Sequence, residues 1–228
     1  MTRKAVALLS GGLDSAVAAA IAISDGFQVH ALTIDYGQRH LRELESAKSV
    51  AEALGVKEHR ILKVDLTGFG GSALTNKKMK VPETRPSEKI GKDIPTTYVP
   101  ARNTVLLGLG LAWAEALGAD AVFIGAHSVD YSGYPDCRPE FLDAFRQVSN
   151  LGTRRGVEGK PIRIEAPLIR MGKREIIERG RELKVPFELT WSCYLGGKKA
   201  CGKCDSCTIR LKAFAEAGME DPIEYERE

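Results

Sequence analysis

The chain has 228 residues, of which 43% are hydrophobic and 28% are charged. This length corresponds to one sizeable domain with an appendage and is enough to bury a core without disulfide bonds, so a disulfide-stapled miniprotein and a disordered chain are excluded. The 33 basic and 30 acidic residues leave a net charge of +3, which is too small to indicate a nucleic-acid partner.

The longest apolar stretches are shorter than the roughly 20 residues that a membrane-spanning helix needs. We therefore expect a soluble, cytoplasmic protein that contacts neither membrane nor nucleic acid. The chain has five cysteines. Cysteines in a reducing compartment remain thiols, so their spacing points to metal binding or chemistry before disulfides.

Short apolar runs alternate with helix-forming segments along most of the chain. Strands are predicted at 4–9, 28–34, 59–64, 121–124 and 162–168, and helices at 14–24, 39–54, 103–117 and 172–183. Repeated strand–helix units predict an α/β fold, a Rossmann-like doubly wound parallel sheet. Ligands of such sheets bind beyond the carboxyl ends of the strands.

Two segments interrupt this alternation. Residues 67–100 have no helical or strand periodicity, and a connection of this length is either disordered or a lid over a site. From Trp191 the composition shifts to cysteine, glycine and lysine. We therefore divide the chain into an α/β domain at 1–185 and a small C-terminal zinc-binding appendage at 186–228.

The sequence Ser-Gly-Gly-Leu-Asp-Ser at 10–15 lies between the first strand and the first helix. Glycines let several backbone N–H groups face one anion, the serines add hydroxyl donors, and the helix N-terminus adds positive charge. A connecting loop with a helix cap is the simpler alternative. The predicted ATP-binding stretch comprises Leu8, Leu9, Ser10, Gly11, Gly12, Leu13, Asp14, Ser15, Ala16, Val17 and Ala18.

Four cysteines, at 193, 201, 204 and 207, lie within fifteen residues. Cys-x2-Cys spacing presents two thiolates to one ion, and four thiolates fill the tetrahedral shell of Zn²⁺. The sequence therefore predicts a structural zinc held by Cys193, Cys201, Cys204 and Cys207. An iron–sulfur cluster is the main competitor, although the Cys-Pro that follows such runs in ferredoxins is absent here, and metal-free thiols are the third alternative.

Acidic, aromatic and thiol side chains follow the fourth predicted strand, in residues 125–141. Aromatic rings stack on a purine-like base, and carboxylates accept paired N–H donors. The candidates for substrate binding are Tyr134, Asp136, Cys137 and Arg138. Packing is the simpler explanation for any one of them, and for the nearby His127.

Five motifs in chain order resemble the 7-cyano-7-deazaguanine synthases, the nitrile-forming enzymes of queuosine biosynthesis. They are SGGLDS at 10–15, DYGQRH at 35–40, YVPARN at 98–103, DYSGYPDCR at 130–138 and WSCY at 191–194 with the trailing cysteines. SGGLDS alone resembles the pyrophosphate loop of the N-type ATP pyrophosphatases. The resemblance covers nearly the whole chain and implies an adenine nucleotide alpha hydrolase-like fold.

The resemblance also implies a carbon–nitrogen ligase that converts 7-carboxy-7-deazaguanine, ATP and ammonia to the 7-cyano base, with Mg²⁺ and zinc bound. It suggests a homodimer. We assign catalytic roles to Asp14, Arg102, Asp130 and Lys173: the two aspartates position Mg²⁺, Lys173 binds phosphates, and Arg102 neutralises developing charge. Two alternatives are a tRNA-thiolating or lysidine-forming relative, and a zinc-stabilised module that binds ATP without turnover.

Overall fold

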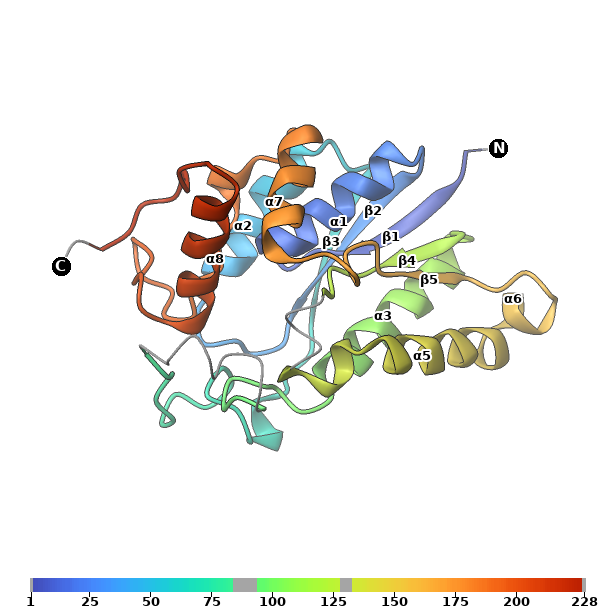
Figure 1. Ribbon diagram of the computed structural model, residues 1–228. Coiled ribbons are helices and arrows are strands. Elements are labelled where there is room, and N and C mark those ends of the chain that lie inside the picture. The colour runs from blue at the N-terminus through green and yellow to red at the C-terminus, as the bar shows by residue number, and fades with distance from the viewer. Residues whose placement is uncertain (1, 84–93, 128–132, 227–228) are drawn as a thin grey trace.

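The computed structural model describes residues 2–83, 94–127 and 133–226, and its centre is one parallel sheet (Figure 1). The strands are β1 (Lys4–Leu8), β2 (Gln28–Asp35), β3 (Glu58–Lys63), β4 (Ala121–Phe123) and β5 (Arg163–Glu165). They are ordered β3-β2-β1-β4-β5, and every pair is parallel. The chain reverses its direction of winding between β1 and β4, so the predicted doubly wound sheet is confirmed.

Helices cover both faces of the sheet (Figure 1). One face carries α1 (Leu13–Ser24), α2 (Arg42–Ala53) and α7 (Lys173–Glu182), and the other carries α3 (Arg102–Leu117) and α5 (Pro139–Gly152). Alternation along β1 supplies both cores, because Ala5 and Ala7 pack toward α1 whereas Val6 and Leu8 pack toward α3. Burial on both faces explains why the central strands are continuous apolar runs.

The structure differs from the sequence prediction at several elements. The helix predicted over 39–54 begins only at Arg42, and β3 is an edge strand whose side chains are largely exposed. The prediction missed α5, the short α6 (Arg154–Val157) and α8 (Asp205–Glu216). Pro139 at the first turn of α5 marks a helix start, but the aromatic and acidic residues before it drew the interpretation toward a binding loop.

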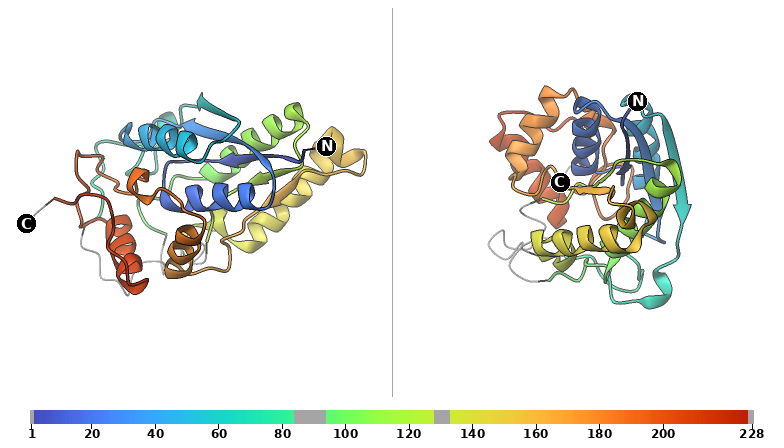
Figure 2. Two further views of the ribbon diagram at one scale, coloured as in Figure 1. Left: turned by 90° about the horizontal axis from the view of Figure 1, so that it is seen from above. Right: turned by 90° about the vertical axis from the view of Figure 1, so that its right-hand side faces the viewer.

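The C-terminal segment lies at the carboxyl ends of the strands, opposite the N-terminus (Figure 2). Its short 3₁₀ turn (Phe187–Leu189) and α8 join the core of the α1 face, where Phe187 and Phe214 pack edge to face with centroids 5.4 Å apart. Arg210, on α8, forms a buried ion pair with Asp221 at 2.7 Å. No helix in the described ranges is long and apolar enough to cross a membrane.

A glycine on α7 allows close approach of this helix to α1. A Cβ atom at Gly180 would lie 2.5 Å from the ring of Phe187 and 2.8 Å from Val17. We expect Gly180→Ala to lower the free energy of unfolding by about 1–2 kcal/mol, because overpacking outweighs the gain in helix propensity. Urea denaturation measures this change.

The matched control is Gly108→Ala in α3, where a Cβ atom would meet no atom within 4 Å. That variant should gain up to about 1 kcal/mol from helix propensity alone. Equal stabilities of the two variants would contradict the packing argument.

Candidate active site and metal centre

The predicted phosphate loop closes on itself at the carboxyl end of β1. Ser15 Oγ donates a hydrogen bond to the carbonyl of Gly12 at 2.9 Å and accepts one from the Ser10 N–H at 3.1 Å. Gly11 has φ +85°, and a Cβ atom there would lie 2.3 Å from the carbonyl oxygen of Glu43. Only glycine fits this position, since both its φ angle and its contact with α2 exclude a side chain.

Asp14, in the first turn of α1, faces two basic side chains from other elements. Lys173 Nζ, at the start of α7, lies 2.6 Å from each carboxylate oxygen, and His127 Nε2, just after β4, lies 3.6 Å from Oδ2. Burial would raise the pKa of Asp14, but the charges of Lys173 and His127 outweigh it and hold this pKa well below its usual range. Asp14 is therefore ionised, and Lys173 is held at the loop although it is 159 residues away in sequence.

A cavity of about 220 Å³ opens beside the loop, at the switch point of the sheet, and is called the main cavity because the loop opens into it. The loop contributes Ser10, Gly12, Asp14 and Ser15 to its wall. The apolar lining is Leu8, Leu9, Leu32, Ile34, Leu74, Leu106, Ile124 and Ala126. A second cavity of about 140 Å³ lies on the other side of Asp14, between His127, Lys173 and the C-terminal segment. Asp14 thus borders both cavities.

Most of the polar part of the main cavity's wall comes from the residues at and after the end of β2 and from the starts of α2 and α3. Its side chains include Tyr36, Gln38, Glu43 and Arg102. Burial raises the pKa of Glu43 to about 7, although Arg102 partly offsets it. Burial and the charge of Glu43 raise the pKa of Tyr36 to about 12, so this phenol remains a hydrogen-bond donor. The Arg102 guanidinium carbon lies 5.7 Å from the centroid of the Tyr36 ring.

The predicted ATP-binding stretch divides between cavity and core. Leu8 and Leu9 line the main cavity, and Leu13 lines the second. Ala16, Val17 and Ala18 are instead buried in the core between α1 and the sheet. Their contribution is to fix the helix that carries the loop.

The four substrate-binding candidates lie in different environments. Cys137 lines the main cavity, whereas Arg138 is exposed. The Asp136 carboxylate accepts the backbone N–H of Asn103 at 2.9 Å, so it caps the start of α3. Tyr134 packs beside Tyr98, with ring centroids 5.9 Å apart. Asp130, a predicted magnesium-positioning residue, lies outside the described residues.

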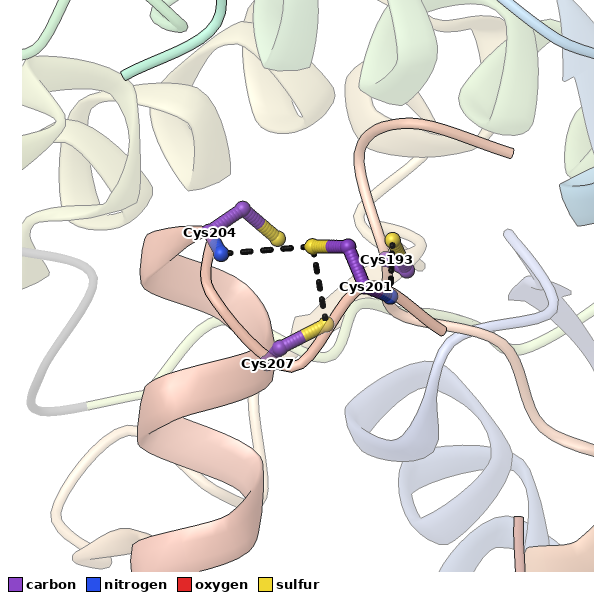
Figure 3. Close-up of side chains that lie close together, drawn as sticks. All are labelled: Cys193, Cys201, Cys204 and Cys207. Atoms are coloured by element: carbon purple, nitrogen blue, oxygen red, sulfur yellow. Dashed lines mark hydrogen bonds between the residues drawn. The ribbon is translucent and has the colours of Figure 1, made fainter. Parts of the chain in front are cut away.

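The four C-terminal cysteines converge as the spacing predicts (Figure 3). Their sulfur atoms lie within 4.8 Å of one another, and all four residues are buried. The Sγ atoms of Cys201 and Cys207 are 3.9 Å apart, close to the roughly 3.8 Å separation of thiolates bound tetrahedrally to one Zn²⁺. The backbone N–H of Leu195 donates to Cys193 Sγ, and that of Lys203 donates to Cys201 Sγ, as expected for thiolate ligands. The residues present therefore fit a four-thiolate metal centre.

This centre supports the wall of the main cavity. Tyr194 follows Cys193 of this cluster and lines both cavities. Ala73 and Val81, from the long connection after β3, pack against the cysteines, and Glu83 forms a backbone bridge with Cys204. The Trp191 N–H donates to the carbonyl of Gly11 at 2.9 Å, which joins this segment to the phosphate loop.

Sequence reasoning assigned no site role to several polar residues, among them His127, Gln38 and Glu43. His127 follows β4 but resembles a packing histidine, and it is 1% exposed. Gln38 lies in the motif at 35–40, and Glu43 has the appearance of an ordinary acid in the first turn of a helix. Position after a parallel strand was the available signal for His127, whereas nothing in the sequence indicates that Glu43 faces a cavity.

Comparison with known proteins finds similarity over nearly the whole chain. A family model described as queuosine biosynthesis protein QueC matches residues 4–218. A 7-cyano-7-deazaguanine synthase from Anaeromyxobacter dehalogenans is 54% identical over 225 residues, which cover 98% of this chain and 96% of the relative. One from Desulfatibacillum aliphaticivorans is 56% identical over 225 residues, covering 97% and 96%.

Solved structures support the fold. An NMN synthetase from Francisella tularensis superimposes with a TM-score of 0.52 at 18% identity, covering 96% of this chain and 79% of that protein. A 4-thiouridine synthetase in an RNA complex with bound ATP has a TM-score of 0.51 at 20% identity, covering 95% and 50%. The full-length family match and the relatives at more than half identity agree, so the chain belongs to the QueC family of queuosine biosynthesis proteins.

Proposed function

We propose that this chain is an ATP-dependent carbon–nitrogen ligase that converts 7-carboxy-7-deazaguanine and ammonia to 7-cyano-7-deazaguanine. The observation that carries the proposal is the placement of the Ser10–Ser15 loop. This loop, with Lys173 held beside it by Asp14, opens into the cavity at the switch point of the sheet. The names of the relatives supply the substrate, and this geometry supplies a place where a phosphate and a flat base share one cavity.

The chemistry requires activation at phosphorus twice. A carboxylate oxygen attacks the α-phosphorus of ATP and expels pyrophosphate, and ammonia then attacks the acyl carbon, releases AMP and loses a proton to leave an amide. A second ATP activates the amide oxygen in the same way. Loss of AMP and of the two amide protons forms the nitrile. One phosphate site thus serves both activations, because the leaving oxygen occupies the same position each time.

The positions of these residues support the roles that we assign to them. Backbone N–H groups of Gly11 and Gly12, with the hydroxyls of Ser10 and Ser15, bind phosphate oxygens at the start of α1. Lys173 adds a positive charge at the same place. Arg102, in the wall of the cavity, balances charge that develops on the transferred group. Tyr134, Cys137 and Arg138 are the proposed substrate contacts. Asp136 would act indirectly, because its carboxylate accepts the Asn103 N–H and so positions the start of α3.

Two metals belong to the proposal. Mg²⁺ screens the charge of the triphosphate when bound, and Asp14 and Asp130 would hold it. The ionised carboxylate of Asp14 is the hard oxygen ligand that Mg²⁺ prefers. Zn²⁺ is the proposed occupant of the four-cysteine centre, where a filled thiolate shell assigns it a structural role. We further propose a cytoplasmic homodimer that acts on small molecules alone.

The test is mass spectrometry of a reaction that contains the protein, 7-carboxy-7-deazaguanine, ATP, Mg²⁺ and ammonium. We expect the 7-cyano base and AMP. ADP in place of AMP would replace adenylation by phosphorylation and leave the overall conversion standing. An unchanged base, with ATP consumed only when tRNA is added, would overturn the proposal in favour of a tRNA-modifying activity.

A further inference from the structure

Glu43 is a carboxylate in the cavity wall that the proposed chemistry does not use. It lies in the first turn of α2, and its backbone carbonyl packs against Gly11 of the phosphate loop. Within the described part of the chain, no hydrogen bond and no ion pair shorter than 4 Å reaches its carboxylate. Glu43 is partly buried, so a ligand that covers the cavity and supplies N–H donors would satisfy a carboxylate that would otherwise lose its water.

Gln38 presents the complementary group to the same cavity. Its Oε1 accepts the backbone N–H of Tyr36 at 2.9 Å. This bond fixes the orientation of the amide, and the Nε2 group is left as a donor at the cavity wall. Glu43 and Gln38 therefore offer two acceptor oxygens and one donor from neighbouring turns of the chain.

The carboxylate that the sequence suggested for base recognition is already engaged elsewhere. Asp136 accepts the Asn103 N–H, and its own backbone carbonyl accepts the Asn103 side-chain amide at 3.1 Å. Asp136 is 6% exposed and is not among the described residues that line the main cavity. Among the cavity's lining residues, Glu43 and Asp14 carry the carboxylates, and Asp14 is paired with Lys173.

We propose that Glu43 and Gln38 read the guanine-type edge of the substrate: the Glu43 carboxylate accepts its N1–H and 2-amino groups, and Gln38 Nε2 donates to its ring oxo group. This inference rests on the proposed function and extends it to specificity. Leu32, Ile34 and Leu106 supply the apolar surface that a flat ring needs.

The arrangement of Glu43 and Gln38 would select a guanine-type base over an adenine-type base and would also orient the bound base. An adenine-type edge offers a ring-nitrogen acceptor where the guanine type offers N1–H, so it would place two acceptors face to face at Glu43. The substrate's carboxylate is on the five-membered ring, away from the 2-amino group. A base held by Glu43 therefore leaves its carboxylate available to the phosphate loop that lines the same cavity.

The test measures binding, separately from turnover. Isothermal titration compares 7-cyano-7-deazaguanine with its analogue that lacks the 2-amino group, on the wild-type chain and on Glu43→Gln. The wild type should bind the analogue about 10- to 100-fold more weakly. Glu43→Gln should bind 7-cyano-7-deazaguanine about 10- to 100-fold more weakly than wild type and should no longer distinguish the two bases.

Glu45→Gln is the matched control, because Glu45 lies on the same helix turn but its side chain is 65% exposed and pairs with Arg42. This variant should bind both bases as the wild type does. ATP affinity and thermal midpoint, measured on every variant, report whether the fold is intact. If Glu43→Gln does not fold, Gln38→Leu tests the other half of the pair, with an expected loss of base affinity and unchanged ATP affinity.

Three results would overturn the inference. They are full discrimination by Glu43→Gln in the titration, a loss of ATP affinity in place of base affinity, and unchanged base affinity together with a loss of kcat in a parallel turnover assay, which would indicate proton transfer. A wild-type chain that binds neither base would instead count against the proposed function. The two failures are therefore distinguishable.

Discussion

Asp14→Asn is expected to lower the turnover of the 7-carboxy base at least about 100-fold while the chain still folds. The neutral amide can no longer hold Lys173 Nζ, which lies 2.6 Å from both carboxylate oxygens, at the phosphate loop. It also withdraws the charge next to His127, which is 1% exposed. Initial rates of AMP formation under saturating ATP measure this effect.

The same substitution should reduce the free energy of unfolding by about 2–3 kcal/mol, less than for a fully buried pair, because Asp14 and Lys173 keep 25% and 18% side-chain exposure. Adding Lys173→Gln removes the uncompensated charge. The double variant should therefore recover the free energy of unfolding but not the turnover. This result would separate the destabilisation caused by the unpaired Lys173 charge from the loss of catalysis. Asp25→Asn, at the exposed C-terminal end of the same helix, is the control and should change neither. Normal turnover of Asp14→Asn would eliminate the assigned role.

Cys204→Ser should reduce bound zinc from one equivalent to well below it and loosen the wall of the main cavity. In the proposed site four thiolates would share one ion, and metal binding of this kind contributes directly to folding. Trp191, which is 4% exposed, packs among the cysteines. Metal loss should therefore shift its fluorescence to longer wavelength, an effect best seen with Trp113, the other tryptophan, replaced by phenylalanine.

Elemental analysis and Trp191 emission together test this prediction. Cys137→Ser is the matched control, since Cys137 lines the main cavity, accepts a hydrogen bond from Asn103 and lies outside the cluster. That variant should retain a full equivalent of zinc. Unchanged metal content in Cys204→Ser would contradict a four-thiolate site, and iron in place of zinc would favour the cluster that the spacing also permits.

The C-terminal segment contacts the phosphate loop that carries Asp14 and contains the four-cysteine cluster to which Cys204 belongs. Its four-cysteine cluster lies beside Tyr194 and the connection from β3, and the backbone N–H of Trp191 donates to the carbonyl of Gly11 in the phosphate loop. Loss of metal should therefore weaken base and ATP binding before it unfolds the sheet, because β1, α1 and their core are held by contacts of their own.

The sequence by itself determined the features that local chemistry encodes. Periodicity identified the strands and most helices, because burial on both faces of a parallel sheet leaves continuous apolar runs. The Ser10–Ser15 loop and the cysteine spacing were recognisable because a turn and a tetrahedral metal site require particular residues at short range. Helices α5 and α8 were missed, since each lies in a segment whose aromatic, acidic or cysteine residues suggested a site.

Only the tertiary structure decided which distant residues meet. Strand order and the pairing of Asp14 with Lys173 and with His127 depend on how the crossovers pack, and no local pattern encodes that. Asp136 and Glu43 cannot be told apart from the local sequence, because each is an acid near a helix start. The fold turns the Asp136 carboxylate onto the end of α3 and leaves the Glu43 carboxylate at the cavity wall.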